Sequence, residues 1–86
     1  MVTKIFEVGQ NPADVYKRAV KWASKQGHTL EEDIPNERIK VKVERWDRMF
    51  ISFTSTEWGT LVTVSFKGGK AEEAYHTLFR ALSGIS

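Results

Sequence analysis

The amino-acid sequence predicts an α+β fold in which two helices pack on one face of a five-stranded antiparallel sheet, in the order β-α-β-β-β-β-α. From Arg38 to Lys67 apolar and polar residues alternate with a period of two, as in an antiparallel sheet with one buried face. Apolar residues at helical spacing occur both before and after this stretch. A chain of 86 residues, 41% of them hydrophobic, is expected to form one domain over residues 1–86.

The first two elements are a strand over residues 2–8 and a helix that follows Gly9-Gln10. Lys4 falls on the core-facing positions of the strand, which weakens its alternation. Asn11 is a good N-cap, and Pro12 suits the first helical position, where its missing N–H costs nothing. Gly27 is expected to end the helix.

Four strands then follow, joined by three hairpins. Their turns are expected at Pro35-Asn36, at residues 45–47 and at Trp58-Gly59. The cross-strand pairs that these turns imply are Asp33 with Arg38, Glu31 with Lys40, Leu30 with Val41, Val41 with Ile51, Ile39 with Phe53, Ile51 with Phe66, and Phe53 with Val64. In this register Glu32 lies on the inner face of the sheet, opposite Ile39.

The second helix is expected from about Lys70 to Leu82, after Gly68-Gly69 has stopped the fifth strand, and Gly84 would end it. The first helix would cross between the two edges of the sheet, so that strand one returns beside strand five. This topology resembles the helix-grip domains, namely one repeat of the TATA-binding-protein fold or a reduced START/Bet v1-like domain. The resemblance covers nearly the whole chain and rests on topology alone, so it implies a fold and no functional residue.

Composition argues against several classes of protein. The chain has no cysteine, hence no disulfide and no thiolate metal site, and no apolar run approaches the ~20 residues of a membrane span. It lacks the apolar region of a signal peptide, and we expect it to be cytoplasmic. His28 and His76 have no metal-ligand spacing, and no nucleophile can be paired with a base, so no metal, cofactor or enzymatic activity is predicted.

The outer face of the sheet, which points away from the helices, is the first candidate site. Large apolar residues stand there among lysines and short hydroxyl side chains. The predicted interface consists of Ile5, Lys40, Lys42, Phe50, Leu61 and Thr63. We expect it to serve self-association or a protein partner. Nucleic acid ranks below these, because a formal charge of +2 is small for a nucleic-acid binder.

Two further sites are predicted. At one end of the sheet the second helix begins, and its free amide groups would attract an anion. The predicted anion site consists of His28, Arg45, Trp46, Arg48, Lys67 and Lys70. A cleft between helices and sheet, lined by Tyr16, Trp22, Tyr75 and Phe79, would hold a small apolar or anionic ligand. No motif determines the function. The preferred hypothesis is a small non-enzymatic binding module that self-associates through the outer sheet face, and small-molecule binding in the cleft is the alternative.

Overall fold

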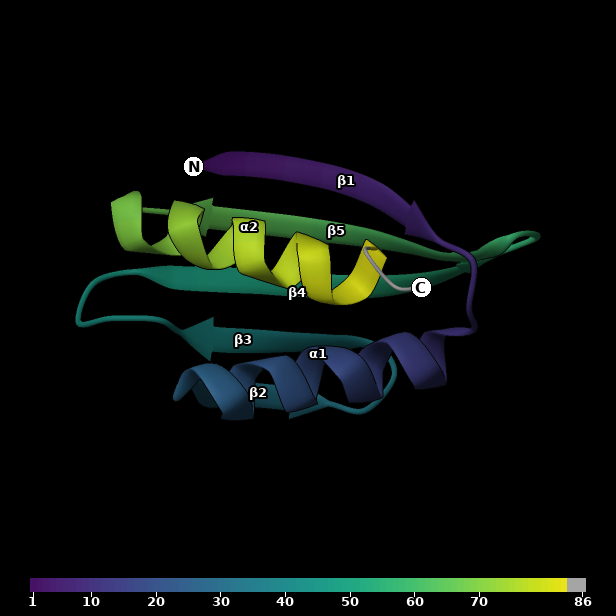
Figure 1. The fold of residues 1–86 in the computed structure, drawn as a ribbon, viewed down its shortest axis with the longest axis horizontal. Coiled ribbons are helices and arrows are strands. Elements are labelled where there is room, and N and C mark those ends of the chain that lie inside the picture. Colours follow the sequence, from purple (N-terminus) through teal and green to yellow (C-terminus); the bar gives the residue numbers. More distant parts are fainter. Residues whose placement is uncertain (84–86) are drawn as a thin grey trace.

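The computed structural model describes residues 1–83, which form five strands and two helices (Figure 1). The elements are β1 (Val2–Val8), α1 (Pro12–Gln26), β2 (Thr29–Ile34), β3 (Arg38–Lys42), β4 (Arg48–Thr56), β5 (Gly59–Lys67) and α2 (Gly69–Ser83). The strands form one sheet in the order β1-β5-β4-β3-β2, with every neighbouring pair antiparallel. Both helices lie on the same side of this sheet, so the predicted fold class and element order are confirmed.

The helices divide the inner face of the sheet between them. Figure 1 shows α1 over the half that contains β2 and β3, and α2 over β4 and β5. Neither helix lies directly over β1 in Figure 1, although β1 pairs with β5 along its whole length and Phe6 on its helix side packs against Phe79 of α2. The predicted helix end at Gly84 lies outside the described residues. None of the helices in residues 1–83 has the length and apolar content needed to cross a membrane.

Local sequence explains the ends of α1. The side chain of Asn11 accepts a hydrogen bond from the backbone N–H of Asp14 at 2.9 Å, which satisfies one of the unpaired amides of the first turn. Pro12 occupies the first helical position. Gly27 ends the helix in the left-handed region with φ of 76°. All three predictions are confirmed.

The core lies between the sheet and the two helices. Alternate residues of the central strands point into it, and each helix contributes one apolar stripe. Its buried residues are Val8, Val15, Ala19, Trp22, Ala23, Ile39, Val41, Met49, Ile51, Phe53, Val62, Val64, Phe66, Ala71, Ala74, Tyr75, Leu78 and Leu82. The inner face of the sheet is therefore used for folding, and its outer face carries no part of this core.

All three hairpins turn at positions other than those predicted. The β2–β3 turn has three residues, with Asn36 in the left-handed region, the β3–β4 loop spans residues 43–47, and the β4–β5 turn is Glu57-Trp58. The observed pairs are Val41 with Met49, Ile39 with Ile51, Ile51 with Val64, and Phe53 with Val62. The pairing registers of the β3–β4 and β4–β5 hairpins are therefore shifted by two residues from the predicted registers. Because side chains alternate with a period of two, such a shift keeps each residue on its predicted face.

A bulge in β2 overturns one predicted orientation. Leu30 pairs with Val41 as expected, but the register shifts between Leu30 and Glu32, so that Glu32 pairs with Lys40 and Asp33 with Ile39. The extra residue reverses the facing of the strand beyond it. The prediction that Glu32 lies on the inner face is therefore wrong, as are the predicted pairs of Asp33 with Arg38 and Glu31 with Lys40.

Candidate interface on the outer sheet face

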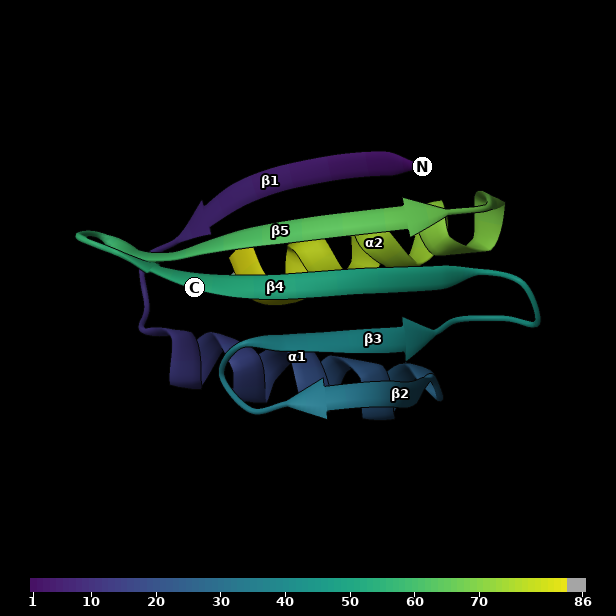
Figure 2. The same cartoon turned by 180° about the vertical axis from the view of Figure 1, so that it is seen from behind.

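The outer sheet face is open over its whole extent. Figure 2 shows the strands in front of both helices, and no segment of residues 1–83 covers them. The six residues predicted for the interface all lie on this face, because each alternates with residues that point into the core. Ile5 is 61% exposed and Phe50 is 39% exposed, whereas Met49 and Ile51 on the other side are fully buried. Thr63 pairs with Ile5 across β5 and β1.

Most of this face carries no charge. We define the uncharged strip as the uncharged outer-face residues in three adjacent rows across β1, β5 and β4: Thr3, Ile5, Phe50, Ser52, Thr54, Leu61, Thr63 and Ser65. Glu7, the charged residue of these rows, pairs with Leu61 at the β1 end of the third row. Five residues of the strip have short hydroxyl side chains, and the hydroxyl oxygens of Thr3 and Ser65 are 3.1 Å apart. The strip is therefore flat, and its three large apolar side chains stand above the hydroxyls.

Cations border the strip on the side of β3, and acids of β2 hold several of them. Arg38 Nε lies 3.4 Å from Glu32 Oε1. Glu31, at the bulge, lies 3.9 Å from Lys40 Nζ and 2.7 Å from Arg48 Nε. Lys40 Nζ is also 5.4 Å from the centre of the Phe50 ring, within the range of a cation–π contact. These contacts position the cationic border beside the strip.

A row of three cations crosses one end of the same face. Lys42, Arg48 and Lys67 are direct neighbours on β3, β4 and β5. Neither Lys42 nor Lys67 takes part in an ion pair within the described residues. We call these three residues the cation row. The sequence analysis assigned Arg48 and Lys67 to the anion site, and their position beside Lys42 follows from the observed register.

The start of α2, on which the predicted anion site depended, is already bound to a carboxylate. Asp47 Oδ2 accepts hydrogen bonds from the backbone N–H of Lys70 at 2.9 Å and of Ala71 at 3.2 Å. A side-chain carboxylate is the group that a helix start favours. An added anion would have to displace Asp47, so these amides are not free to bind one.

The six residues of the predicted anion site also divide among three parts of the structure, of which the first two adjoin because Arg48 Nη1 donates a hydrogen bond to the carbonyl of Arg45 at 3.1 Å. Arg48 and Lys67 belong to the cation row. Arg45 and Trp46 lie in the β3–β4 loop, where Trp46 is 81% exposed and its ring centre is 5.9 Å from the guanidinium of Arg45. The other two line a depression of about 200 Å³ on the helix side, with the residues Gln26, His28, Val43, Glu44, Lys70, Glu73, Ala74 and Thr77. The two acids in this lining disfavour an anion there.

The aromatic residues predicted to line a cleft instead fill three positions around the core. Tyr16 packs edge-on against Phe53 with ring centres 6.0 Å apart. Trp22 is buried and its indole Nε1–H donates to Thr77 Oγ1 at 2.9 Å. Tyr75 stacks on Phe66, and Phe79 packs against Phe6 at 4.9 Å. None of the depressions described for residues 1–83 is lined by any of these four side chains.

The two histidines belong to different parts of the chain, with His28 between α1 and β2 and His76 on α2. His28 packs against Trp22 with ring centres 5.2 Å apart, and burial lowers its pKa below the usual value of 6.5. His76 is exposed on α2. No cluster of three or more His, Asp or Glu side chains in residues 1–83 is arranged to hold a metal ion.

Comparison with known proteins identifies the fold and no family. No protein-family model and no curated protein matches the chain. Solved structures with a similar fold include the protein SSP2350 from Staphylococcus saprophyticus, with a TM-score of 0.64 and 15% identity over 93% of this chain and 79% of that one. The protein MLL2253 from Mesorhizobium loti has a TM-score of 0.62 and 13% identity over 94% of this chain and 92% of its own. Identities this low establish a shared fold alone.

Proposed function

We propose that this protein is a small non-enzymatic interaction module that self-associates through its outer sheet face. The observation that carries the proposal is the uncharged strip, which exposes Ile5 and Phe50 and leaves Leu61 partly exposed on a face that no element of residues 1–83 covers. A second copy is the occupant that this surface suits. Two antiparallel sheets pack face to face at about 10 Å, and short hydroxyl side chains permit that approach.

The charged border supports the same proposal. Arg38, Lys40 and Arg48 are paired with Glu31 or Glu32 on their own sheet, so their charges are partly compensated before any contact with a second copy. An interface with an apolar centre and a polar rim of this kind is the usual arrangement between proteins. The outward turn of Glu32 also supports a non-enzymatic role, since it pairs with Arg38 and does not stand in the interior. A cytoplasmic location accords with the absence of cysteine.

The experiment measures the mass of the protein in solution by light scattering after size exclusion, over a hundredfold range of concentration. We expect a dimer that dissociates on dilution, and we expect Phe50→Asp or Ile5→Asp to shift the equilibrium to monomer. Phe79→Asp is the matched control, because Phe79 on the helix side is 40% exposed and Phe50 is 39% exposed. A monomer at every concentration, or equal weakening by Phe79→Asp, would contradict the proposal.

A second candidate function is binding of single-stranded nucleic acid at the cation row. The specific observation is that Lys42, Arg48 and Lys67 are adjacent, with the exposed ring of Trp46 in the loop beside Arg48. Cations that follow a phosphate backbone, next to an aromatic ring that stacks on a base, are the elements of such sites. Quenching of tryptophan fluorescence by oligothymidylate would measure this binding. Three phosphate contacts predict a slope of log K against log salt of about −2, which Lys42→Glu with Lys67→Glu should abolish.

Small-molecule binding between helices and sheet has weaker support. Tyr16, Trp22 and Tyr75 each pack against core residues, and the side chains between the helices and the sheet are buried. The helix-grip resemblance is the remaining argument for it. Native mass spectrometry of the purified protein tests this alternative, since a retained apolar ligand would add to the mass of the chain.

A further inference from the structure

The strand β1 is an edge of the sheet with a free row of backbone groups. It pairs with β5 on one side, over seven residue pairs from Val2 to Val8, and stands last in the strand order on the other side. In an antiparallel strand the residues alternate, so that every second N–H and C=O points away from the existing partner. These groups form a template for an added strand.

The opposite edge of the sheet is more strongly protected against strand addition than β1. β2 carries a bulge at Glu31 and three successive acids, and both features are known to obstruct edge pairing. β1 has a regular register without a bulge and contains no proline. The single charge on its helix side is Lys4, which opposes an added strand unless that strand supplies an acid to pair with it. If a strand is added to this sheet, β1 is therefore the edge that accepts it.

The helix side of β1 offers an alternation of apolar, cationic and apolar contacts. Val2, Lys4 and Phe6 point to this side, because their partners on β5 are the buried residues Phe66, Val64 and Val62. Val2 is 47% exposed at one end. At the other end Phe6 packs against Phe79 with ring centres 4.9 Å apart, and Phe79 remains 40% exposed.

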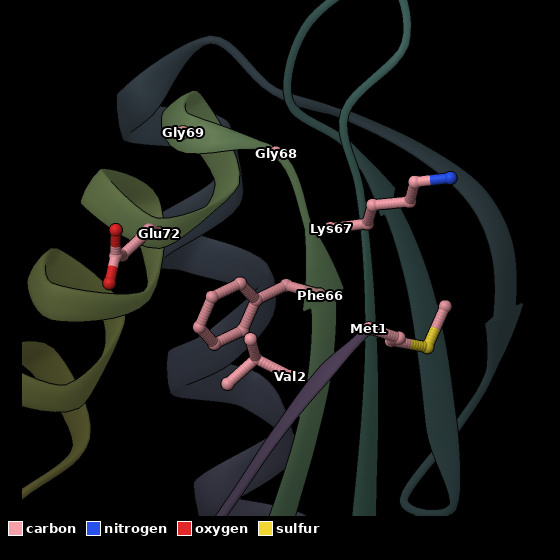
Figure 3. Close-up of a pocket in the computed structure, with 7 residues that line it drawn as sticks. All are labelled: Met1, Val2, Phe66, Lys67, Gly68, Gly69 and Glu72. Carbon is pink, nitrogen blue, oxygen red and sulfur yellow. The ribbon is translucent and has the colours of Figure 1, made fainter.

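A depression of about 290 Å³ adjoins the Val2 end (Figure 3). Its lining includes Val2 and Phe66 from the sheet and Glu72 from α2, and Figure 3 shows the side chains of Val2 and Phe66 close together on the side of α2. Between the two apolar ends, Lys4 is exposed and takes part in no ion pair within residues 1–83. The arrangement thus has two apolar positions and one unpaired cation at every second residue.

We propose that the β1 edge binds an extended segment of a partner protein in which alternate residues are apolar, acidic and apolar. The main chain of the segment adds a sixth strand, and its side chains on the helix side lie next to Val2, Lys4 and Phe6. One apolar side chain reaches the depression at Val2, the carboxylate pairs with Lys4, and the other apolar side chain packs on Phe6 and Phe79. The order apolar, acidic, apolar reads the same in both chain directions, so the segment can pair with β1 in a parallel or an antiparallel orientation. This site is distinct from the outer sheet face and does not depend on the proposed self-association.

The test is a titration of the ¹⁵N-labelled protein with the peptide Thr-Val-Thr-Glu-Thr-Phe-Thr, followed by NMR. We expect the largest shifts at the backbone amides of residues 2–8 and at Phe79. A peptide with Lys in place of Glu should bind about fivefold more weakly to the unchanged protein, as expected from a cross-strand charge pair. Lys4→Glu should reverse this preference. Lys42→Glu is the matched control, because Lys42 is an exposed lysine on the outer face of β3, three strands away from β1.

Three results would overturn the proposal. Shifts centred on Phe50 and Thr63 would place the peptide on the outer sheet face. Equal binding of the Glu and Lys peptides by the unchanged protein would show that Lys4 does not recognise an acidic side chain. This comparison uses no protein variant, so misfolding of a variant cannot affect it. Concentration-dependent protection of the β1 amides from hydrogen exchange without peptide would show that a second copy occupies the edge.

Discussion

The carboxylate of Asp47 fills the space that a side chain at Gly68 would need. Gly68 precedes α2 and has φ of 102°, a conformation that side chains disfavour. From this position the carboxylate accepts hydrogen bonds from the amides of Lys70 and Ala71, which are 23 and 24 residues further along the chain. The β3–β4 loop and the start of α2 are therefore held together by one acidic side chain and one residue without a side chain.

This relationship predicts that substitutions at the two positions are not additive. Asp47→Ala should lower the free energy of unfolding by about 1 kcal/mol, the usual cost of losing a helix cap. Gly68→Ala should cost about 1–2 kcal/mol from its backbone conformation alone, and more while Asp47 is present. In the double variant the overlap is gone, so its loss should be smaller than the sum. Urea denaturation of the four proteins measures this coupling, and strict additivity would show that the two residues act independently.

Tyr16 links α1 to the bulged strand. Its hydroxyl donates a hydrogen bond to Asp33 Oδ1 at 2.5 Å, and this bond, with burial and the charge of Asp33, raises the pKa of Tyr16 above 10.0. A raised pKa stabilises the folded state below pH ~10 and loses that contribution as the pH rises through the folded value. Tyr16→Phe should lower the stability by about 0.5–1.5 kcal/mol at pH 7 and by less near pH 11. A constant difference across this range in urea denaturation would contradict the assignment.

The bulge that brings Asp33 to Tyr16 also marks the limit of sequence-based prediction for this chain. Alternation predicted the faces of Phe50 and Thr63 correctly even though the hairpin registers were shifted, because the shifts were of two residues. The bulge shifts the register by one, and the acidic run in β2 contains no apolar residue that would reveal the change.

The candidate sites also differ in whether a local sequence pattern or a contact between distant residues determines them. The outer-face residues could be predicted, since each strand determines their orientation locally. The anion site could not, because it depended on which distant groups meet at the start of α2. The capping of Lys70 by Asp47 joins residues that no local pattern relates. The edge position of β1, by contrast, agrees with the topology that the sequence predicted, in which strand one lies beside strand five at an edge of the sheet.

A hydrogen bond between Trp22 and Thr77 connects the two helices. The indole Nε1–H donates to Thr77 Oγ1 at 2.9 Å, and Thr77 donates to the carbonyl of Ala74, also at 2.9 Å. Thr77→Val has a similar shape but leaves the N–H of the buried Trp22 without an acceptor, so we expect a loss of about 1–3 kcal/mol. Thr77→Ser keeps the acceptor and should cost less. Equal losses for the two variants in urea denaturation would mean that the methyl group of Thr77, and not its hydroxyl, supports this contact.

His28 should make the protein less stable in weak acid. Burial lowers the pKa of His28 below 6.5, so the unfolded chain binds a proton more readily than the folded one. The free energy of unfolding therefore falls as the pH drops below about 6.5, and the loss is complete once the pH is below the folded value. His28→Gln cannot be protonated and should flatten the dependence of the urea midpoint between pH 7 and pH 5, while the exposed His76→Gln serves as the control. If both variants keep the slope of the unchanged protein, another group carries the acid sensitivity, and the packing of His28 on Trp22 does not control its protonation.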